Sequence, residues 1–196
     1  MKSSSPVPRA PKPHPGSAAS ALRERLALNQ AGLEAAKNDL HAGAVTPQLG
    51  PWRDEIIGLL NDALATAWVC VMRYRRHHFT ASGLAASAIA SEFLVHANDE
   101  MLHADQLARR IVQLGGEPDF NPDTLSQRSH ASYSAVRELQ SMLRANLISE
   151  RVTIEAYSQM VVLIGDKDPT TRRLLESILA QEQRHAEALA SWLTPA

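Results

Sequence analysis

Apolar side chains recur at helical spacing along most of this chain, and almost no stretch has the strict alternation of a half-buried strand. The pattern predicts an all-α protein with four long helices, at about 51–79, 83–115, 131–164 and 169–194. Breaks rich in glycine, proline or aspartate separate them, such as "GGEPDFNPD" and "GDKDP". The middle connection is the longest, so we expect a four-helix bundle with a long B–C crossover between its second and third helices.

A further helix and a tail precede the predicted bundle. The stretch "AASALRERLALNQAGLEAAKNDLHAG" is rich in Ala, Leu, Glu and Arg and ends in Gly43, which predicts an extra helix at about 18–42. Residues 1–17 contain five prolines and three basic residues without an acid, a composition that cannot build a packed core. We therefore expect a disordered basic tail, followed by a helical domain at 18–196 with its bundle at about 51–194.

Composition limits the class of protein. With 196 residues, 44% hydrophobic residues and a formal net charge of −1, the chain can bury one substantial core. No uninterrupted apolar run approaches the roughly 18 residues that a membrane span needs, so we expect a cytoplasmic protein without membrane contact. The one cysteine, Cys70, fits a small core residue. The cationic tail is either a solvated arm or a weak contact for nucleic acid.

Two segments place an acid and a histidine three positions apart. "NDEMLHADQ" contains Glu100 and His103, and "AQEQRHAEA" contains Glu182 and His185. Residues at this spacing share a helix face, so each pair can direct a carboxylate and an imidazole at one point. This combination of ligands suits iron, manganese or zinc, and a carboxylate can bridge two ions because it has two oxygens. The two pairs predict a metal site inside the bundle.

A third acid, Glu150, belongs to the same predicted site. It lies in "LISERVTIEAY" among apolar residues, where a carboxylate is costly to bury unless it is paired or bound to metal. Glu150 precedes the second acid–histidine pair by nearly the interval at which Ala67 precedes the first. Tyr157 lies seven residues after Glu150, and Tyr74 lies seven after Ala67, which supports this register. One helix therefore has the tyrosine without the carboxylate.

With these motifs, the chain resembles the ferritin-like superfamily, and bacterioferritins in particular, from about Gly43 to Leu193. The resemblance runs through "EFLVHANDEMLHAD", "RIVQLGGEP" and "QEQRHAEALA", which include both E-x-x-H motifs. It implies a ferritin-like four-helix bundle that assembles as a homo-oligomer. It also implies iron oxidation (ferroxidase activity), with ferrous iron and oxygen or peroxide as substrates, and iron storage or detoxification at a di-iron centre.

The resemblance implies a role for each candidate ligand. Glu100 and Glu182 would bridge the two irons, and they are also candidate catalytic residues. His103 and His185 would each bind one iron through nitrogen. Glu150 would be a terminal ligand to the iron that His185 holds.

The counterpart of Glu150 is Ala67, so the half of the centre built on His103 lacks its terminal carboxylate. We therefore expect the two iron positions to be occupied unequally, or the centre to be mononuclear. Glu92 and His96 lie on the stripe of the second helix that carries the first motif. They are either outer ligands or transit ligands that compensate for the vacancy, or polar residues packed beside the centre.

Two more residues have alternative roles. Tyr74 is a candidate catalytic residue that donates hydrogen bonds or electrons near the centre, and a buried tyrosine anchored by its hydroxyl is the alternative. The resemblance implies a haem ligand at Met101, which follows the first motif glutamate and points away from the metal face. Packing in a helix–helix interface explains this methionine equally well in physical terms.

Two other functions are compatible with the sequence. The first is a degenerate ferritin-like subunit that binds metal weakly and serves in assembly or in shielding DNA. The second is another di-metal enzyme on the same bundle, such as an oxidase or a hydroxylase.

Overall fold

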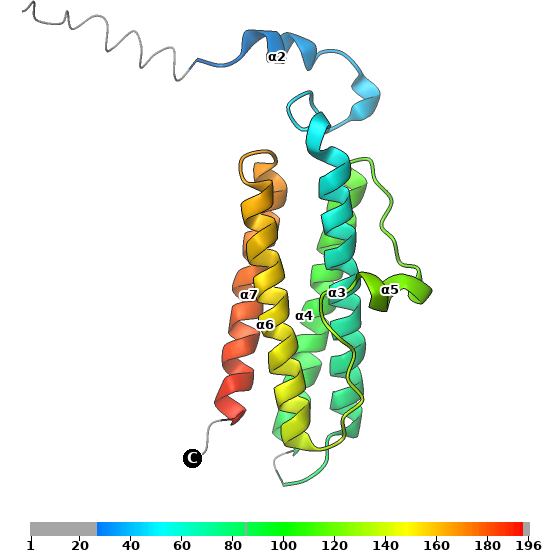
Figure 1. Ribbon diagram of the computed structural model, residues 1–196, viewed down its shortest axis with the longest axis vertical. Coiled ribbons are helices and arrows are strands. Elements are labelled where there is room, and N and C mark those ends of the chain that lie inside the picture. Colours follow the sequence, from blue (N-terminus) through cyan, green and yellow to red (C-terminus); the bar gives the residue numbers. More distant parts are fainter. Residues whose placement is uncertain (1–26, 85, 194–196) are drawn as a thin grey trace, which may run out of the picture. The chain divides into compact units, whose positions relative to one another are not determined.

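The computed structural model (Figure 1) describes residues 27–84 and 86–193 of the chain. The chain separates into two compact units, Met1–Asn38 and Asp39–Ala196. The tail expected at 1–17 lies outside the described residues, so it stays a prediction.

The described part of the first unit contains a short helix, α2 (Gln30–Ala35). The side chain of Asn29 caps it by accepting a hydrogen bond from a backbone N–H of the first turn. The extra helix expected at about 18–42 is therefore not continuous through its described part. Asp39 has a left-handed backbone conformation (φ 52°), which a regular α-helix cannot include, and the 3₁₀ helix η1 (Leu40–Ala42) follows it in the second unit.

The second unit is a bundle of long helices (Figure 1). Their bounds are α3 (Arg53–Thr80), α4 (Ala86–Gln113), α6 (Leu139–Ile164) and α7 (Pro169–Leu193). Two shorter elements, the 3₁₀ helix η2 (Gly50–Trp52) and the helix α5 (Pro122–Arg128), precede α3 and α6 respectively. No strand occurs in the part of the chain that the structure describes, which confirms the all-α class.

The connection between α4 and α6 runs along the outside of the bundle from one end to the other and carries α5 (Figure 1). This arrangement confirms the long B–C crossover. The helix α3 packs chiefly against α4, and α6 packs chiefly against α7. The expected helix start near residue 131 was wrong, because α6 begins at Leu139. Its cap is Glu138, whose carboxylate accepts hydrogen bonds from Gln140 N at 2.8 Å and Ser141 N at 2.6 Å.

Two arginines of α3 explain this late start. Arg73 is fully buried and donates to Ser132 O at 3.0 Å. Arg76 donates to Ala135 O at 2.8 Å and to Val136 O at 2.9 Å. The end of the crossover is therefore held against α3 through its backbone carbonyls, instead of forming the first turns of α6.

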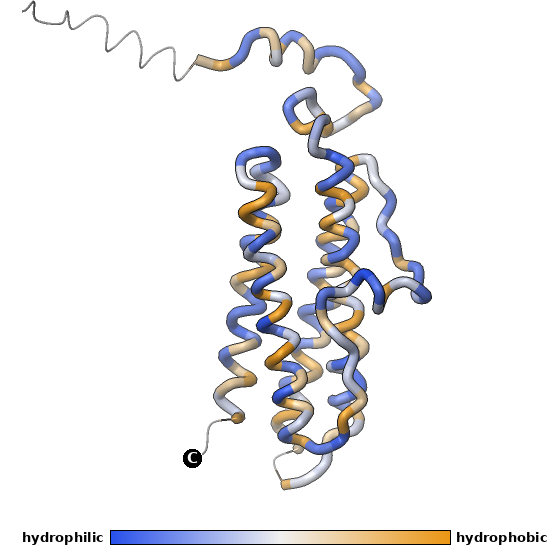
Figure 2. Tube along the Cα trace, in the orientation of Figure 1, coloured by the Kyte–Doolittle hydropathy of each residue, from blue (hydrophilic) through white to orange (hydrophobic). Residues whose placement is uncertain are grey.

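Apolar residues recur along each long helix between hydrophilic ones (Figure 2), and inside the bundle they form two large clusters. The first includes Leu64 and Leu107, and the second includes Phe93 and Leu143. Along α4, α6 and α7, buried acids and histidines occur in sequence between the residues of these two clusters. The bundle therefore has a polar layer between two apolar ones.

Gly50–Thr80, which contains α3, is long and apolar enough to cross a membrane by length and composition alone. Of its most apolar window, 56% is buried inside the bundle, and Leu60 and Leu64 are fully buried in the first cluster. This segment is a core helix of the bundle, since its buried apolar side chains already have protein partners.

Candidate metal centre

The candidate ligands lie on three helices. The helix α4 carries Glu100 and His103, α6 carries Glu150, and α7 carries Glu182 and His185. All five residues are buried, and each is at most 4% exposed. Their carboxylates and imidazoles have therefore lost their contact with water. This burial is costly in free energy unless the groups are paired or bind an ion.

Four of these side chains converge on one point. Glu100, Glu150, Glu182 and His185 each offer one ligand atom, and these atoms all lie within 4.8 Å of one another. His103 adjoins them, since its Nδ1 lies 2.9 Å from Glu182 Oε1 and 3.6 Å from Glu100 Oε2. The structure thus brings the five sequence-predicted metal ligands into one buried carboxylate–histidine cluster.

Many polar atoms of this cluster have no hydrogen-bond partner among the described residues. They are both carboxylate oxygens of Glu100 and of Glu182, Oε2 of Glu150, Nδ1 of His185, and both ring nitrogens of His103. The 2.9 Å contact between His103 Nδ1 and Glu182 Oε1 is an ion pair that lacks hydrogen-bond geometry. Buried polar groups are otherwise almost always hydrogen-bonded, so these atoms fit the ligands of a cation.

The three carboxylates differ in their affinity for protons. Burial raises the pKa of Glu100 and of Glu150, and the neighbouring carboxylate of Glu182 raises both further. Burial also acts to raise the pKa of Glu182, but contacts with His103 and His185 outweigh it and lower the pKa. Without a metal ion, the cluster therefore keeps Glu182 ionised and disfavours charge on the other two.

The two histidines of the motifs respond in the opposite direction. Burial acts to lower the pKa of His103, but contacts with Glu100 and Glu182 raise it to about 10. The pKa of His185 is also raised against burial, mainly by Glu182. His103 is therefore a charged imidazolium at neutral pH in the metal-free protein, the pKa of His185 is shifted in the same direction, and a metal ion must compete with protons at both histidines.

Tyr74 links the centre to α3. Its hydroxyl donates a short hydrogen bond to Glu150 Oε1 and lies 3.1 Å from His96 Nδ1. The second ring nitrogen of His96, Nε2, lies 3.2 Å from Glu92 Oε1, and the side chain of Glu92 is partly exposed. Tyr74 is therefore a buried tyrosine anchored by its hydroxyl, and its partner is a candidate metal ligand.

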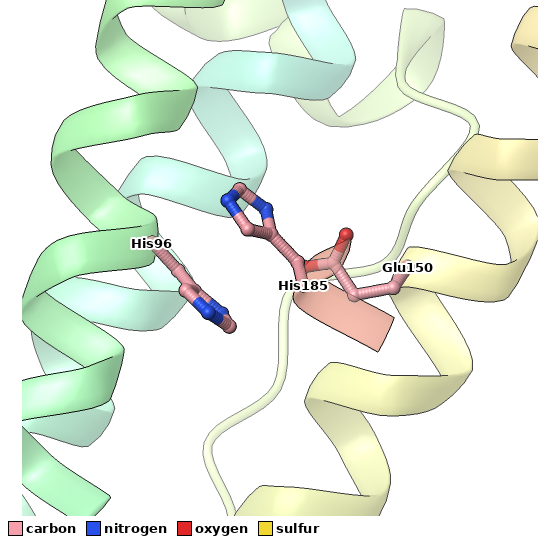
Figure 3. Close-up of side chains that lie close together, drawn as sticks. All are labelled: His96, Glu150 and His185. Atoms are coloured by element: carbon pink, nitrogen blue, oxygen red, sulfur yellow. The ribbon is translucent and has the colours of Figure 1, made fainter. Parts of the chain in front are cut away.

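His96 is closer to the centre than its place in the sequence indicates. One ligand atom from each of His96, Glu150 and His185 lies within 4.8 Å of the others (Figure 3). The rings of His96 and His185 stack, with centroids 4.1 Å apart and an interplanar angle of 21°. Burial, and next the nearby His185, lower the pKa of His96 to about 3, so this imidazole is neutral at neutral pH.

Position 67 on α3 carries an apolar residue in apolar surroundings. Ala67 is 1% exposed and lies in the first apolar cluster with Tyr157 and Ile178. The hydroxyl of Tyr157 has no hydrogen-bond partner within the described chain. Neither group of candidate ligands found in residues 27–84 and 86–193 includes an acid of α3.

Sequence reasoning missed Asp99. Its Oδ2 lies 3.1 Å from His185 Nε2, and its side chain is 27% exposed. This contact fixes the ring and leaves Nδ1 of His185 on the side of Glu182, 3.6 Å from Oε2. The only sequence signal for this role of Asp99 was that it is an acid adjacent to Glu100 of the first motif. Met101 is partly exposed, and a haem ligand there stays a prediction.

Comparisons with known proteins agree with this geometry. The family model described as ferritin-like domain matches residues 57–195. Bacterioferritin from Desulfovibrio desulfuricans is 30% identical over 132 residues, which cover 67% of this chain and 70% of that protein. The nutrient stress-induced DNA-binding protein from a Synechococcus strain is 29% identical over 141 residues, covering 69% of this chain and 79% of that protein.

Two solved structures are similar in fold. The dodecameric thioferritin from Bacteroides fragilis, a bacterioferritin-related protein, aligns with a TM-score of 0.69 and 29% identity over 72% of this chain and 85% of its own. The Desulfovibrio desulfuricans bacterioferritin, described with a diiron site, aligns with a TM-score of 0.66 and 26% identity over 76% of this chain and 83% of its own.

Proposed function

Because this chain belongs to the ferritin-like domain family, we propose that it binds ferrous iron at its buried carboxylate–histidine cluster and oxidises it. Ferrous iron and oxygen or peroxide are then the substrates, and the ferric product is stored or kept from harmful reactions. One observation carries the proposal. Four ligand atoms, from Glu100, Glu150, Glu182 and His185, lie within 4.8 Å of one another in the bundle interior.

The free atoms of the cluster support a division of roles. Within the described residues, both oxygens of Glu100 and of Glu182 lack hydrogen-bond partners, so each of these carboxylates can bridge two cations. Glu150 has one free oxygen, because the other accepts the hydrogen bond of Tyr74, and this suits a terminal ligand. His185 offers Nδ1, because Asp99 occupies Nε2. These atoms are hard oxygen and borderline nitrogen donors, which ferrous iron accepts.

The chain's own contribution is to hold ions and to release protons. Oxidation transfers one electron from each ferrous ion to oxygen or peroxide. Tyr74 fixes the carboxylate of Glu150 by donating to Oε1, and Asp99 fixes the ring of His185. Iron binding competes with protons at His103 and His185, whose pKa values are raised, since a metal ion binds the unprotonated imidazole.

The two halves of the centre are unequal in this proposal. The half that contains Glu150 and His185 has a terminal carboxylate and a histidine of its own. The half that contains His103 has the apolar side chain of Ala67 where a carboxylate would complete it. The first iron therefore binds tightly, and the second binds weakly or in transit.

Aerobic iron oxidation tests the proposal. The initial rate of ferric absorbance is measured for the wild type, for Glu182→Gln and for Asp105→Asn. Asp105 is an exposed acid of α4 in a long 3.9 Å ion pair with the exposed Arg109. It serves as the matched control. We expect Glu182→Gln to lose at least about tenfold in rate and Asp105→Asn to retain the wild-type rate. Equal rates for all three proteins would contradict ferroxidase activity at this cluster.

A DNA-shielding assembly with weak metal binding is the second candidate function. It is favoured by the 29% identity to the nutrient stress-induced DNA-binding protein. Protection of plasmid DNA from nuclease, at physiological salt and without iron, distinguishes it from oxidation and storage. Protection together with a negligible oxidation rate would favour this candidate.

We also propose a cytoplasmic homo-oligomer. The related Bacteroides fragilis protein is described as dodecameric, which makes a symmetric assembly the natural expectation for this chain. Native mass measurement gives the subunit number. The visible absorption spectrum of the purified protein tests the haem expected at Met101.

A further inference from the structure

The two helical hairpins of the bundle differ in polarity at equivalent positions. The offset along the chain that relates Glu100 to Glu182 also relates His96 on α4 to Ile178 on α7. Ile178 lies in an apolar cluster with Ala67 and Tyr157. His96, by contrast, is buried beside Tyr74 and His185.

The extra imidazole therefore lies on the side of the centre that retains its terminal carboxylate. One ligand atom of His96 is within 4.8 Å of one from Glu150 and one from His185, and all three residues are buried (Figure 3). These side chains come from α4, α6 and α7, so three separate helices converge here. Three metal-binding side chains of this kind at one buried point fit a single transition-metal ion.

We propose that His96 is a direct nitrogen ligand of the metal ion that Glu150 and His185 hold, which makes this half a two-histidine, one-carboxylate site. The inference rests on the proposed function, because it concerns the same ion. It goes further by giving that ion a second imidazole, whereas the position equivalent to His96 on the other helical hairpin is Ile178, in an apolar cluster. A divalent first-row ion with affinity for imidazole is the class of ligand that such a site takes.

His96 must exchange one of its present contacts to bind the ion. Its Nδ1 faces the hydroxyl of Tyr74 at 3.1 Å, and its Nε2 faces Glu92 Oε1 at 3.2 Å. Water can replace the imidazole at Glu92, because the side chain of Glu92 is 34% exposed. A turn of the ring from its stacked position then frees a nitrogen at little cost in unsatisfied polar groups.

Counting coordinated imidazoles tests the inference without an activity assay. The full-length protein is loaded with one equivalent of Cu²⁺ per chain, and pulsed electron paramagnetic resonance counts the bound imidazoles in frozen solution. We expect His96→Gln to lose one imidazole relative to the wild type and to bind Co²⁺ about 10-fold or more weakly in a chelator competition. Glu92→Gln should keep the wild-type count, because it removes a partner of His96 and not the imidazole.

A second variant keeps the test valid if His96→Gln does not fold. In His103→Gln, the remaining histidines of the centre are His96 and His185, so two bound imidazoles in this variant support the inference and one overturns it. An unchanged count and affinity in folded His96→Gln also overturns it while leaving the proposed function intact. A wild-type protein that binds no copper or cobalt in the bundle overturns both.

Discussion

Tyr74 and Tyr157 occupy equivalent positions on α3 and α6, but only the hydroxyl of Tyr74 has hydrogen-bond partners within the described residues. Tyr74 donates to Glu150, seven residues before Tyr157, whereas the residue seven before Tyr74 is Ala67. Within the described residues, the hydroxyl of Tyr157 therefore lacks the kind of partner that Glu150 provides for Tyr74, and Ala67 is the residue that corresponds to Glu150. A glutamate at position 67 would supply a hydrogen-bond acceptor for Tyr157 and a terminal ligand for the half that contains His103.

The variant Ala67→Glu should restore this half of the centre. In the metal-free protein, the buried carboxyl should cost about 1–3 kcal/mol of unfolding free energy, because it loses its hydration. With ferrous iron the sign should reverse, since a ligand that binds only the folded state stabilises it. Melting temperature and initial iron-oxidation rate, each with and without iron, measure both effects.

Ala67→Gln is the matched control for this variant, because it has nearly the same volume without the charge. It should share the destabilisation and show no gain with iron. If Ala67→Glu is destabilised in both conditions and oxidises iron no faster, position 67 does not face the vacant ligand position.

Metal affinity should increase with pH. The pKa of His103 is raised to about 10, so its imidazole is protonated at pH 7, and the pKa of His185 is also raised, so protons compete with the ion at both histidines. Below the pKa that each histidine has in the folded, metal-free protein, every further fall in pH therefore weakens metal binding at that histidine. Calorimetry of Co²⁺ binding in buffers of different ionisation enthalpy should detect at least about one proton released per ion. Binding without proton release would contradict these pKa shifts.

The two halves of the centre should respond differently to loss of a ligand. Glu150→Gln removes the terminal carboxylate of the complete half and should abolish the tighter metal-binding phase. His103→Gln affects the half that already lacks a carboxylate and should alter mainly the weaker phase. A titration of metal-free protein with Co²⁺ separates the phases. Equal weakening of a single phase by both variants would argue against unequal sites.

The start of α7 depends on a buried ion pair remote from the candidate metal centre. Arg110 Nη2 donates to Asp168 Oδ2 at 2.8 Å, and Asp168 also accepts a hydrogen bond from Thr171 N at 3.0 Å. Removing this carboxylate leaves a buried guanidinium unpaired, so Asp168→Ala should lose about 3–5 kcal/mol of unfolding free energy in urea denaturation.

The adjacent exposed pair is the control for this prediction. Asp166 Oδ1 lies 2.8 Å from Arg172 Nη1, but its side chain is 99% exposed. Asp166→Ala should change the unfolding free energy by about 1 kcal/mol at most. Equal effects of the two variants would show that burial does not determine the contribution of these ion pairs.

Periodicity and breaks in the sequence were sufficient to predict the helical class, the long crossover and the existence of the long helices. The start of α6 could not be predicted from them, because residues 132–137 follow a helical pattern but are held by Arg73 and Arg76 through backbone carbonyls. Such a tertiary contact leaves no local signal. The short helix α5 was missed for a related reason, since its segment reads as a break.

The pairing of Glu100 with His103 on α4 and of Glu182 with His185 on α7 followed from their spacing, because residues three apart share a helix face. The positions of Asp99 and His96 beside the candidate metal centre could not be predicted from spacing. Asp99 is adjacent to Glu100 in sequence and reaches His185 on another helix, and His96 stacks on the same ring. Both contacts depend on how α4 and α7 are rotated relative to each other, which the pattern on one helix cannot determine.

The most direct measurement is the anomalous diffraction of iron in a crystal of the protein loaded with ferrous iron. We predict a strong peak inside the bundle, bounded by Glu100, Glu150, Glu182 and His185, with a weaker peak or none beside His103. Iron found only on the protein surface, with the interior carboxylates free of anomalous density, would contradict the claim that this cluster is a metal centre.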